Sequence, residues 1–163
     1  MKTLIIVRHS KSSWKNMNLS DYERPLSKRG KKDAEIMSTE LFKKKISIDF
    51  LLSSSSKRTI ITSKYFIDKI KINQYDFFES LYHASSDKIY NSIIELKNEF
   101  NKVMIVGHNP GLTNTINLLT NISLDNLPTS GIVIIEFNIS NWNEVQPKLG
   151  KAIWIKFPKD FKL

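Results

Sequence analysis

The sequence contains no cysteine, so disulfide bonds, thiolate nucleophiles and cysteine-ligated zinc or iron–sulfur sites are all excluded. Glycine and proline are sparse, with five of each, and no linker rich in them divides the 163 residues. We therefore expect a single domain that spans residues 1–163. No apolar run approaches the roughly 20 residues needed to cross a bilayer, and the N-terminal apolar stretch ends at Arg8, too early for a signal peptide. These absences favour a cytoplasmic protein.

Acidic residues are also relatively few. The sequence has 16 aspartate and glutamate residues against 25 lysine and arginine residues, which gives a net charge of +9. Most of the excess is lysine scattered along the chain, which is typical of a solvated surface that attracts anionic partners. The sequence has no recognisable nucleic-acid-binding motif. Only four arginines occur, Arg8, Arg24, Arg29 and Arg58. Because a guanidinium grips phosphate through two hydrogen bonds and lysine does not, these four are candidate phosphate ligands.

Short apolar runs alternate with segments of helical pattern over most of the chain. Strands are predicted at residues 4–7, 48–52, 75–78, 103–106, 132–137 and 152–157, and helices at 27–44, 57–70, 86–100 and 110–119. This alternation indicates an α/β fold with a parallel sheet covered by helices on both faces. The last two strands have no helix between them, so that pair is predicted to be antiparallel.

Polar side chains suited to phosphate chemistry follow three of the predicted strands. Arg8 and His9 come directly after the first strand, Arg58 lies just past the second, and His108 follows the fourth. Because ligands bind beyond the carboxyl ends of parallel strands, we expect these groups to meet in one crevice. Arginines can orient a phosphoryl group, one histidine can attack phosphorus, and the other can donate to the developing charge. Two histidines without a nearby carboxylate make a poor metal site, so no metal or cofactor is expected.

Several segments of the sequence resemble the histidine phosphatase superfamily. Val7-Arg8-His9 is similar to its Arg-His-Gly signature, with Ser10 in place of the glycine. The wider string 6–14 resembles the phosphohistidine phosphatase (SixA-type) branch of that superfamily. Further segments match the same branch in the expected order, at residues 21–30, 53–62, 81–85, 106–112 and 127–131.

The resemblance implies both a fold and a set of site residues. The fold would be a three-layer α/β/α sandwich of the phosphoglycerate mutase-like kind, with a mostly parallel central sheet and an antiparallel strand. His9 would be the nucleophile that is phosphorylated during turnover, and Arg8, Arg58 and His108 would complete the phosphate pocket. Arg24, in the Arg-Pro-Leu match, would be an additional phosphate or substrate contact.

The general acid is an open question at this point. Many members of the superfamily carry a carboxylate that protonates an alcohol leaving group, and Glu79 lies in about the right region. His83 is a second candidate for that task, and Glu79 can equally be read as an exposed loop residue. An alkoxide needs a proton in the transition state, whereas phosphohistidine leaves as imidazole, a good leaving group near neutral pH. A site without a dedicated acid would thus favour phosphoramidates.

We therefore expect a metal-independent phosphatase that acts through phospho-His9, most simply on phosphohistidine in proteins. A chain of 163 residues has little room for insertions that enclose a small metabolite, and an open pocket suits a phosphorylated side chain on a protein. Two alternatives stay open, a phosphatase for a small-molecule phosphate ester and a catalytically silent phosphate-binding module. Neither nucleic acid nor a membrane is expected as a partner.

Overall fold

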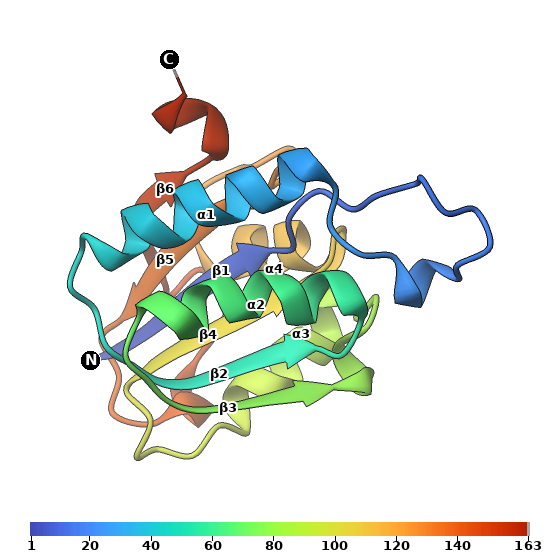
Figure 1. Cartoon of the computed structure of the whole chain (residues 1–163). Coiled ribbons are helices and arrows are strands. Elements are labelled where there is room, and N and C mark those ends of the chain that lie inside the picture. The colour runs from blue at the N-terminus through green and yellow to red at the C-terminus, as the bar shows by residue number, and fades with distance from the viewer. Residues whose placement is uncertain (163) are drawn as a thin grey trace.

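The computed structural model describes residues 1–162 and arranges them as one sheet between two layers of helices (Figure 1). The three-layer α/β/α fold predicted from the sequence is thereby confirmed. In chain order the elements are β1 (Lys2–Arg8), α1 (Lys28–Phe42), β2 (Ile48–Ser54), α2 (Lys57–Lys69), β3 (Ile72–Phe78), α3 (Ser86–Ile94), β4 (Lys102–Gly107), α4 (Gly111–Leu119), β5 (Ile132–Phe137) and β6 (Lys151–Lys156). Short 3-10 helices are η1 (Asp21–Glu23), η2 (Glu79–Leu81), η3 (Trp142–Glu144) and η4 (Pro158–Phe161).

The sheet has the strand order β3-β2-β4-β1-β5-β6. Strands β1 to β4 pair in parallel, and β5 is antiparallel to both of its neighbours, β1 and β6. The predicted antiparallel arrangement of the last two strands is therefore confirmed. In the pairing of β1 with β4, Arg8 lies opposite Gly107. The residues that follow these two strands, His9 and His108, consequently leave the sheet side by side.

Helices α1 and α2 cover one face of the sheet, and α3 and α4 cover the other (Figure 1). The residues of β1 alternate between the two resulting cores. Leu4 and Ile6 pack in the core that contains α3 and α4, whereas Ile5 and Val7 pack in the core that contains α1 and α2. All four are fully buried, which explains why this strand is a continuous apolar run rather than an alternating one.

Two helix ends illustrate what sequence patterns can and cannot predict. Ser27, the first residue of the predicted helix 27–44, caps α1, because its Oγ accepts a hydrogen bond from the Gly30 N–H at 3.0 Å. The prediction that the third helix continues to residue 100 is wrong, since α3 ends at Ile94. The reason is tertiary: the Asn98 carbonyl accepts from Lys2 Nζ at 2.6 Å, and Asn98 Oδ1 accepts from the Trp142 N–H at 2.9 Å.

The segment between β1 and α1 projects beyond the end of the sheet at which β1 to β4 finish (Figure 1). Its base is closed by an antiparallel bridge between Ser12 and Leu26. Gly30 allows the start of α1 to approach this base closely, because a Cβ atom there would lie 2.0 Å from the Lys11 carbonyl oxygen. Among residues 1–162, no helix is long and apolar enough to cross a membrane.

Candidate active site

The four residues predicted at the carboxyl ends of the strands lie around one cavity. Arg8 is the last residue of β1, His9 follows it, His108 follows β4, and Arg58 is in the first turn of α2. The ring centroids of His9 and His108 are 5.2 Å apart. All four side chains line the same cavity of about 250 Å³. The structure thus brings together the residues for which the strand order predicted a common crevice.

Most of the remaining lining residues are polar, and two of them, Lys11 and Arg24, are positively charged. The lining thus includes Arg24, which the sequence predicted as an additional phosphate or substrate contact. Within the described residues, no three His, Cys, Asp or Glu side chains are arranged to hold a metal ion. Such a lining favours an anionic ligand. The remaining lining residues are Lys11, Ser12, Trp14, His83, Asn109 and Thr129.

His9 is held as a neutral imidazole with one free ring nitrogen. Its Nδ1 lies 2.8 Å from the Ser10 carbonyl oxygen. Because a carbonyl only accepts, Nδ1 carries the ring hydrogen and Nε2 keeps its lone pair. Burial lowers the pKa of His9 to about 3, and the positive charges of Arg58 and Arg8 act in the same direction. At neutral pH the Nε2 atom is therefore unprotonated, as a nucleophile requires.

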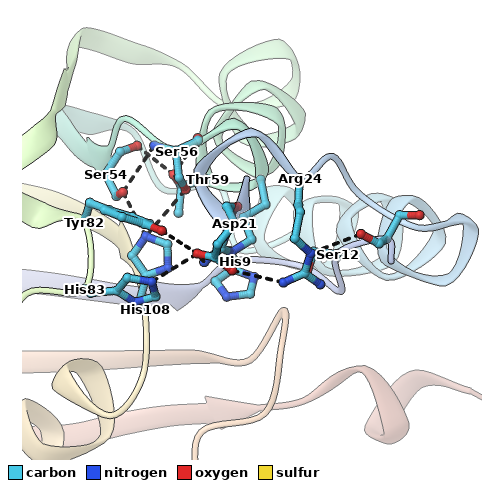
Figure 2. Close-up of polar contacts among 12 residues, drawn as sticks. His9, Ser12, Asp21, Arg24, Ser54, Ser56, Thr59, Tyr82, His83 and His108 are labelled. Carbon is cyan, nitrogen blue, oxygen red and sulfur yellow. Dashed lines mark hydrogen bonds and ion pairs between the residues drawn. The ribbon is translucent and has the colours of Figure 1, made fainter. Parts of the chain in front are cut away.

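A chain of hydroxyl groups from the end of β2 orients His108 (Figure 2). His108 Nε2 lies 2.8 Å from Ser54 Oγ, and that oxygen accepts from the Ser56 N–H at 3.3 Å. The Ser54 hydroxyl can donate its hydrogen to Nε2, and in that tautomer Nδ1 carries the ring hydrogen. Burial lowers the pKa of His108 to about 2, with His9 and Arg58 adding to the effect. In that tautomer His108 is a neutral hydrogen-bond donor through Nδ1.

Two buried donors of the cavity wall have no hydrogen-bond partner among the described residues, His108 Nδ1 and Arg8 Nε. The other end of Arg8 is fixed, since its Nη1 donates to the Leu127 carbonyl at 2.9 Å. Burial lowers the pKa of Arg8, and the Arg58 charge contributes in the same sense. A buried donor without a partner costs about 1–3 kcal/mol. An anionic ligand in the cavity would supply the acceptor that both atoms lack.

Asp21 is a central residue of the site that the sequence reasoning missed. Its Oδ2 accepts from Arg58 Nη2 at 3.0 Å, from His83 Nε2 at 3.1 Å and from the Tyr82 hydroxyl. Its Oδ1 accepts from Arg24 Nη1 at 3.1 Å, and Figure 2 shows the carboxylate between Arg24 and His83. Burial raises the pKa of Asp21, but the hydrogen bonds from Tyr82, Arg58 and His83 outweigh it and hold that pKa well below its usual range. Asp21 therefore stays ionised.

One signal in the sequence could have pointed to Asp21. It stands three residues before Arg24, which is the spacing of side chains that meet on one helical turn. In the structure that turn is η1. This spacing is the one signal, because the surrounding loop has no periodic pattern that would strengthen the expectation of a helical turn.

The two candidate general acids lie in different places. Glu79 is exposed at the start of η2 and is not part of the cavity lining, so the structure does not bring it to the other site residues. His83 does line the cavity, with its ring centroid 4.9 Å from that of His108. Ser10, which stands where the superfamily signature has glycine, is fully buried and donates its N–H to Thr62 Oγ1 at 3.0 Å.

Comparison with known proteins agrees with this geometry. Residues 4–81 match the model of the histidine phosphatase superfamily, branch 1. Over this stretch, which is just under half of its length, the chain resembles the histidine phosphatase superfamily. The matched range contains Arg8, His9, Arg24 and Arg58, and His108 lies beyond it.

Relatives and solved structures resemble the chain over nearly its whole length. An uncharacterized chloroplastic protein of Arabidopsis thaliana is 27% identical, over 94% of this chain and 74% of its own. An uncharacterized protein of Mycobacterium tuberculosis is 24% identical, over 94% and 100%. The protein histidine phosphatase SixA complexed with tungstate has a TM-score of 0.84 at 20% identity, over 98% of this chain and 99% of that one. Phosphoserine phosphatase of Entamoeba histolytica with 3-phosphoglyceric acid has a TM-score of 0.64 at 15% identity, over 95% and 96%. The structural matches show a shared fold.

Proposed function

We propose that this protein is a phosphohistidine phosphatase of the SixA-type branch, which works without a metal ion through a covalent intermediate on His9. Its family and fold indicate a phosphatase. The observation that carries the proposal is the neutral His9 ring, whose Nε2 is free beside guanidinium groups in the cavity. We also propose that residues 1–162 form one domain, since β1 and β5, which are far apart in the sequence, are neighbours in the sheet, and that the protein is cytoplasmic.

The arrangement supports phosphoryl transfer in two steps. In the first, the lone pair of His9 Nε2 attacks phosphorus, and the bond from phosphorus to the leaving group breaks with its electron pair going to the leaving atom. Arg8 and Arg58 neutralise the phosphoryl oxygens, and His108 Nδ1 donates to the charge that develops on one of them. In the second step, water attacks phospho-His9, releasing phosphate and the neutral ring.

Arg24 would reach the same ligand from the wall formed by the loop between β1 and α1. Its guanidinium is buried, with its carbon 3.2 Å from the centroid of the Trp14 ring. Its Nη2 donates to Ser12 Oγ at 2.6 Å, and its Nη1 is paired with Asp21. These contacts fix the planar group, so that a phosphoryl oxygen would meet it without further loss of side-chain entropy.

Three observations favour phosphohistidine as the substrate. The cavity of about 250 Å³ is smaller than the roughly 300–1,000 Å³ of pockets that enclose a drug-sized ligand, and suits a phosphoryl group on a protruding side chain. Among residues 1–162, its lining contains no carboxyl group that could protonate an alkoxide, whereas imidazole is a good leaving group. The net charge of +9 favours association with an acidic phosphorylated protein, in a way that salt weakens.

The test is hydrolysis of a phosphohistidine peptide and of p-nitrophenyl phosphate, with EDTA present, by wild type, His9→Ala and Glu79→Gln. We expect wild type and Glu79→Gln to hydrolyse the peptide at the same rate, and His9→Ala to lose the activity. If a phosphate ester is the preferred substrate, and Glu79→Gln slows hydrolysis of the ester but not of the peptide, the result supports the small-molecule alternative instead. Binding of phosphate without hydrolysis of either substrate would point to a silent phosphate-binding module.

A further inference from the structure

His83 has a position and a partner that the two-step mechanism has not yet used. We propose that His83, oriented by Asp21, is the general base that activates the water molecule which hydrolyses phospho-His9. The inference rests on the proposed covalent mechanism and assigns a residue to its second step.

The three histidines of the cavity lie at different depths. His9 and His108 are 8% and 3% exposed, whereas the side chain of His83 is 52% exposed. His83 therefore stands toward the solvent side, next to the His108 ring, and the other two are buried beneath. In an in-line displacement, the leaving group departs opposite His9 Nε2, and the attacking water arrives on that same outer side. His83 is thus the histidine placed on the side from which water enters.

Asp21 fixes which nitrogen of His83 can take a proton. His83 Nε2 lies 3.1 Å from Asp21 Oδ2, and the hydrogen bonds that hold the pKa of Asp21 low keep this carboxylate ionised. An ionised carboxylate only accepts, so Nε2 carries a hydrogen, and in the neutral ring Nδ1 has the lone pair. The same carboxylate stabilises the imidazolium that forms when Nδ1 becomes protonated, as in other base–orienter pairs. Figure 2 shows the two side chains joined by this contact.

The step that follows from this pairing balances in atoms and charge. The oxygen of water forms a bond to phosphorus, and the bond from phosphorus to His9 Nε2 breaks, with its electron pair returning to the ring. The proton that the water loses goes to His83 Nδ1. The products are inorganic phosphate, neutral His9 and protonated His83, which then returns its proton to solvent. The first step needs no such base, because the nucleophile is already neutral and a phosphohistidine whose other ring nitrogen carries a hydrogen leaves as neutral imidazole.

The backbone at His83 supports a functional placement. Its φ angle is 51°, in the left-handed region, where residues other than glycine are uncommon although histidine is better tolerated than most. Residues in sparsely populated backbone regions persist where surrounding structure holds them, and they cluster at active sites. Here the flanking turns are closed by hydrogen bonds from the N–H of Tyr82 to Glu79 and from the N–H of Ala84 to Leu81. The turn thus places the ring against the cavity.

The positive φ also decides which substitution tests the proposal. Asparagine adopts this conformation more readily than most residues and has no basic nitrogen, so His83→Asn removes the base with little strain on the turn. Lys45, which is exposed and also has a positive φ, of 56°, lies outside the cavity lining. Lys45→Asn is therefore the control, because it introduces the same residue at another position with a positive φ.

The experiment follows the phosphoenzyme by rapid quench after mixing with a phosphohistidine peptide. In His83→Asn, we expect phospho-His9 to form within about threefold of the wild-type rate. Its decay should be about 10²-fold slower or more, the usual contribution of general base catalysis, so the intermediate accumulates. Added imidazole should restore part of the decay rate, which a purely structural defect would not allow. Lys45→Asn should match wild type in both rates.

Two results would overturn the inference, and a third would overturn the mechanism beneath it. If phospho-His9 in His83→Asn decays at the wild-type rate, His83 is not the base. If formation and decay slow by the same factor, and imidazole restores neither, His83 is a structural residue. If wild type itself turns over the peptide without any phospho-His9, the covalent mechanism fails, whatever His83 does.

Discussion

Lowering the pH from 7 to 5 is expected to destabilise the folded protein through its two buried histidines. Burial is the main cause that lowers the pKa of His9 to about 3 and that of His108 to about 2, and neighbouring positive groups add to it. In the unfolded chain both rings have the ordinary pKa of about 6.5. Between these limits the unfolded chain binds protons that the folded protein does not. Stability therefore falls as the pH drops below about 6.5, and this loss continues until the folded-state pKa is reached.

The size of the effect follows from linkage. Between pH 7 and pH 5, protonation of the unfolded state alone costs the folded state about 2 kcal/mol for each histidine. This figure is the same for any folded-state pKa below about 4, which includes the values for both His9 and His108. The pair together accounts for about 4 kcal/mol. That is a large share of the roughly 5–15 kcal/mol by which single domains are stable.

The assay is urea unfolding at pH 7 and pH 5, in buffers free of phosphate because a bound anion would stabilise the folded state. In His9→Asn, which cannot titrate in this range, the loss of stability between the two pH values should shrink by about 2 kcal/mol. Ile134→Val is the control, since it removes one methyl group from a fully buried side chain. It should lower stability by about 0.5–1.5 kcal/mol at both pH values. The reasoning is refuted if acidification costs His9→Asn as much as it costs wild type.

Three further predictions concern activity. Ser54→Ala removes the hydroxyl that lies 2.8 Å from His108 Nε2 and orients the ring. We expect kcat for the phosphohistidine peptide to fall about tenfold, equivalent to one hydrogen bond of about 1.4 kcal/mol. An unchanged kcat would show that other contacts orient His108. Gly30→Ala would place a Cβ atom 2.0 Å from the Lys11 carbonyl oxygen and so displace the loop that carries Arg24. We expect kcat/KM to drop at least about tenfold. Full activity would mean that the loop adjusts freely. The pKa of His9 is lowered to about 3, so the ring stays unprotonated between pH 7 and 5. Over this range kcat/KM for p-nitrophenyl phosphate should therefore show no fall caused by protonation of His9. A fall in kcat/KM that follows a pKa near 6.5, with no matching fall in the rate of phosphoenzyme decay, would contradict a neutral His9.

Much of the fold could be predicted from the sequence because the core strands are continuous apolar runs. Residues 4–7 and 103–106 are buried on both faces of the sheet in β1 and β4. Such runs can be recognised as strands without knowledge of the strands they pair with. Once the strands were assigned, the common edge of Arg8, His9 and His108 followed from the geometry of parallel sheets.

The parts that could not be predicted depend on contacts between distant segments. The early end of α3 is set by Lys2 and Trp142, which lie far from Asn98 in the sequence. Asp21 likewise acquires its importance from residues in other elements, Arg58 in α2 and His83 beyond η2. A loop carboxylate has no periodic signature that distinguishes it from solvated neighbours. Glu79 is the opposite case. Its place in the sequence suggested a role as general acid, but in η2 its side chain is exposed and lies outside the lining of the active-site cavity.

The central claim is that His9 carries the phosphoryl group during turnover. The most direct measurement is mass spectrometry of the wild-type protein, quenched during hydrolysis of a phosphohistidine peptide at a pH that preserves phosphohistidine and then digested. We predict one phosphoryl group on the peptide that contains His9, formed as fast as the first turnover and absent from His9→Ala. Sustained hydrolysis with no phosphoryl group on His9, or with the group on another residue, would contradict the account.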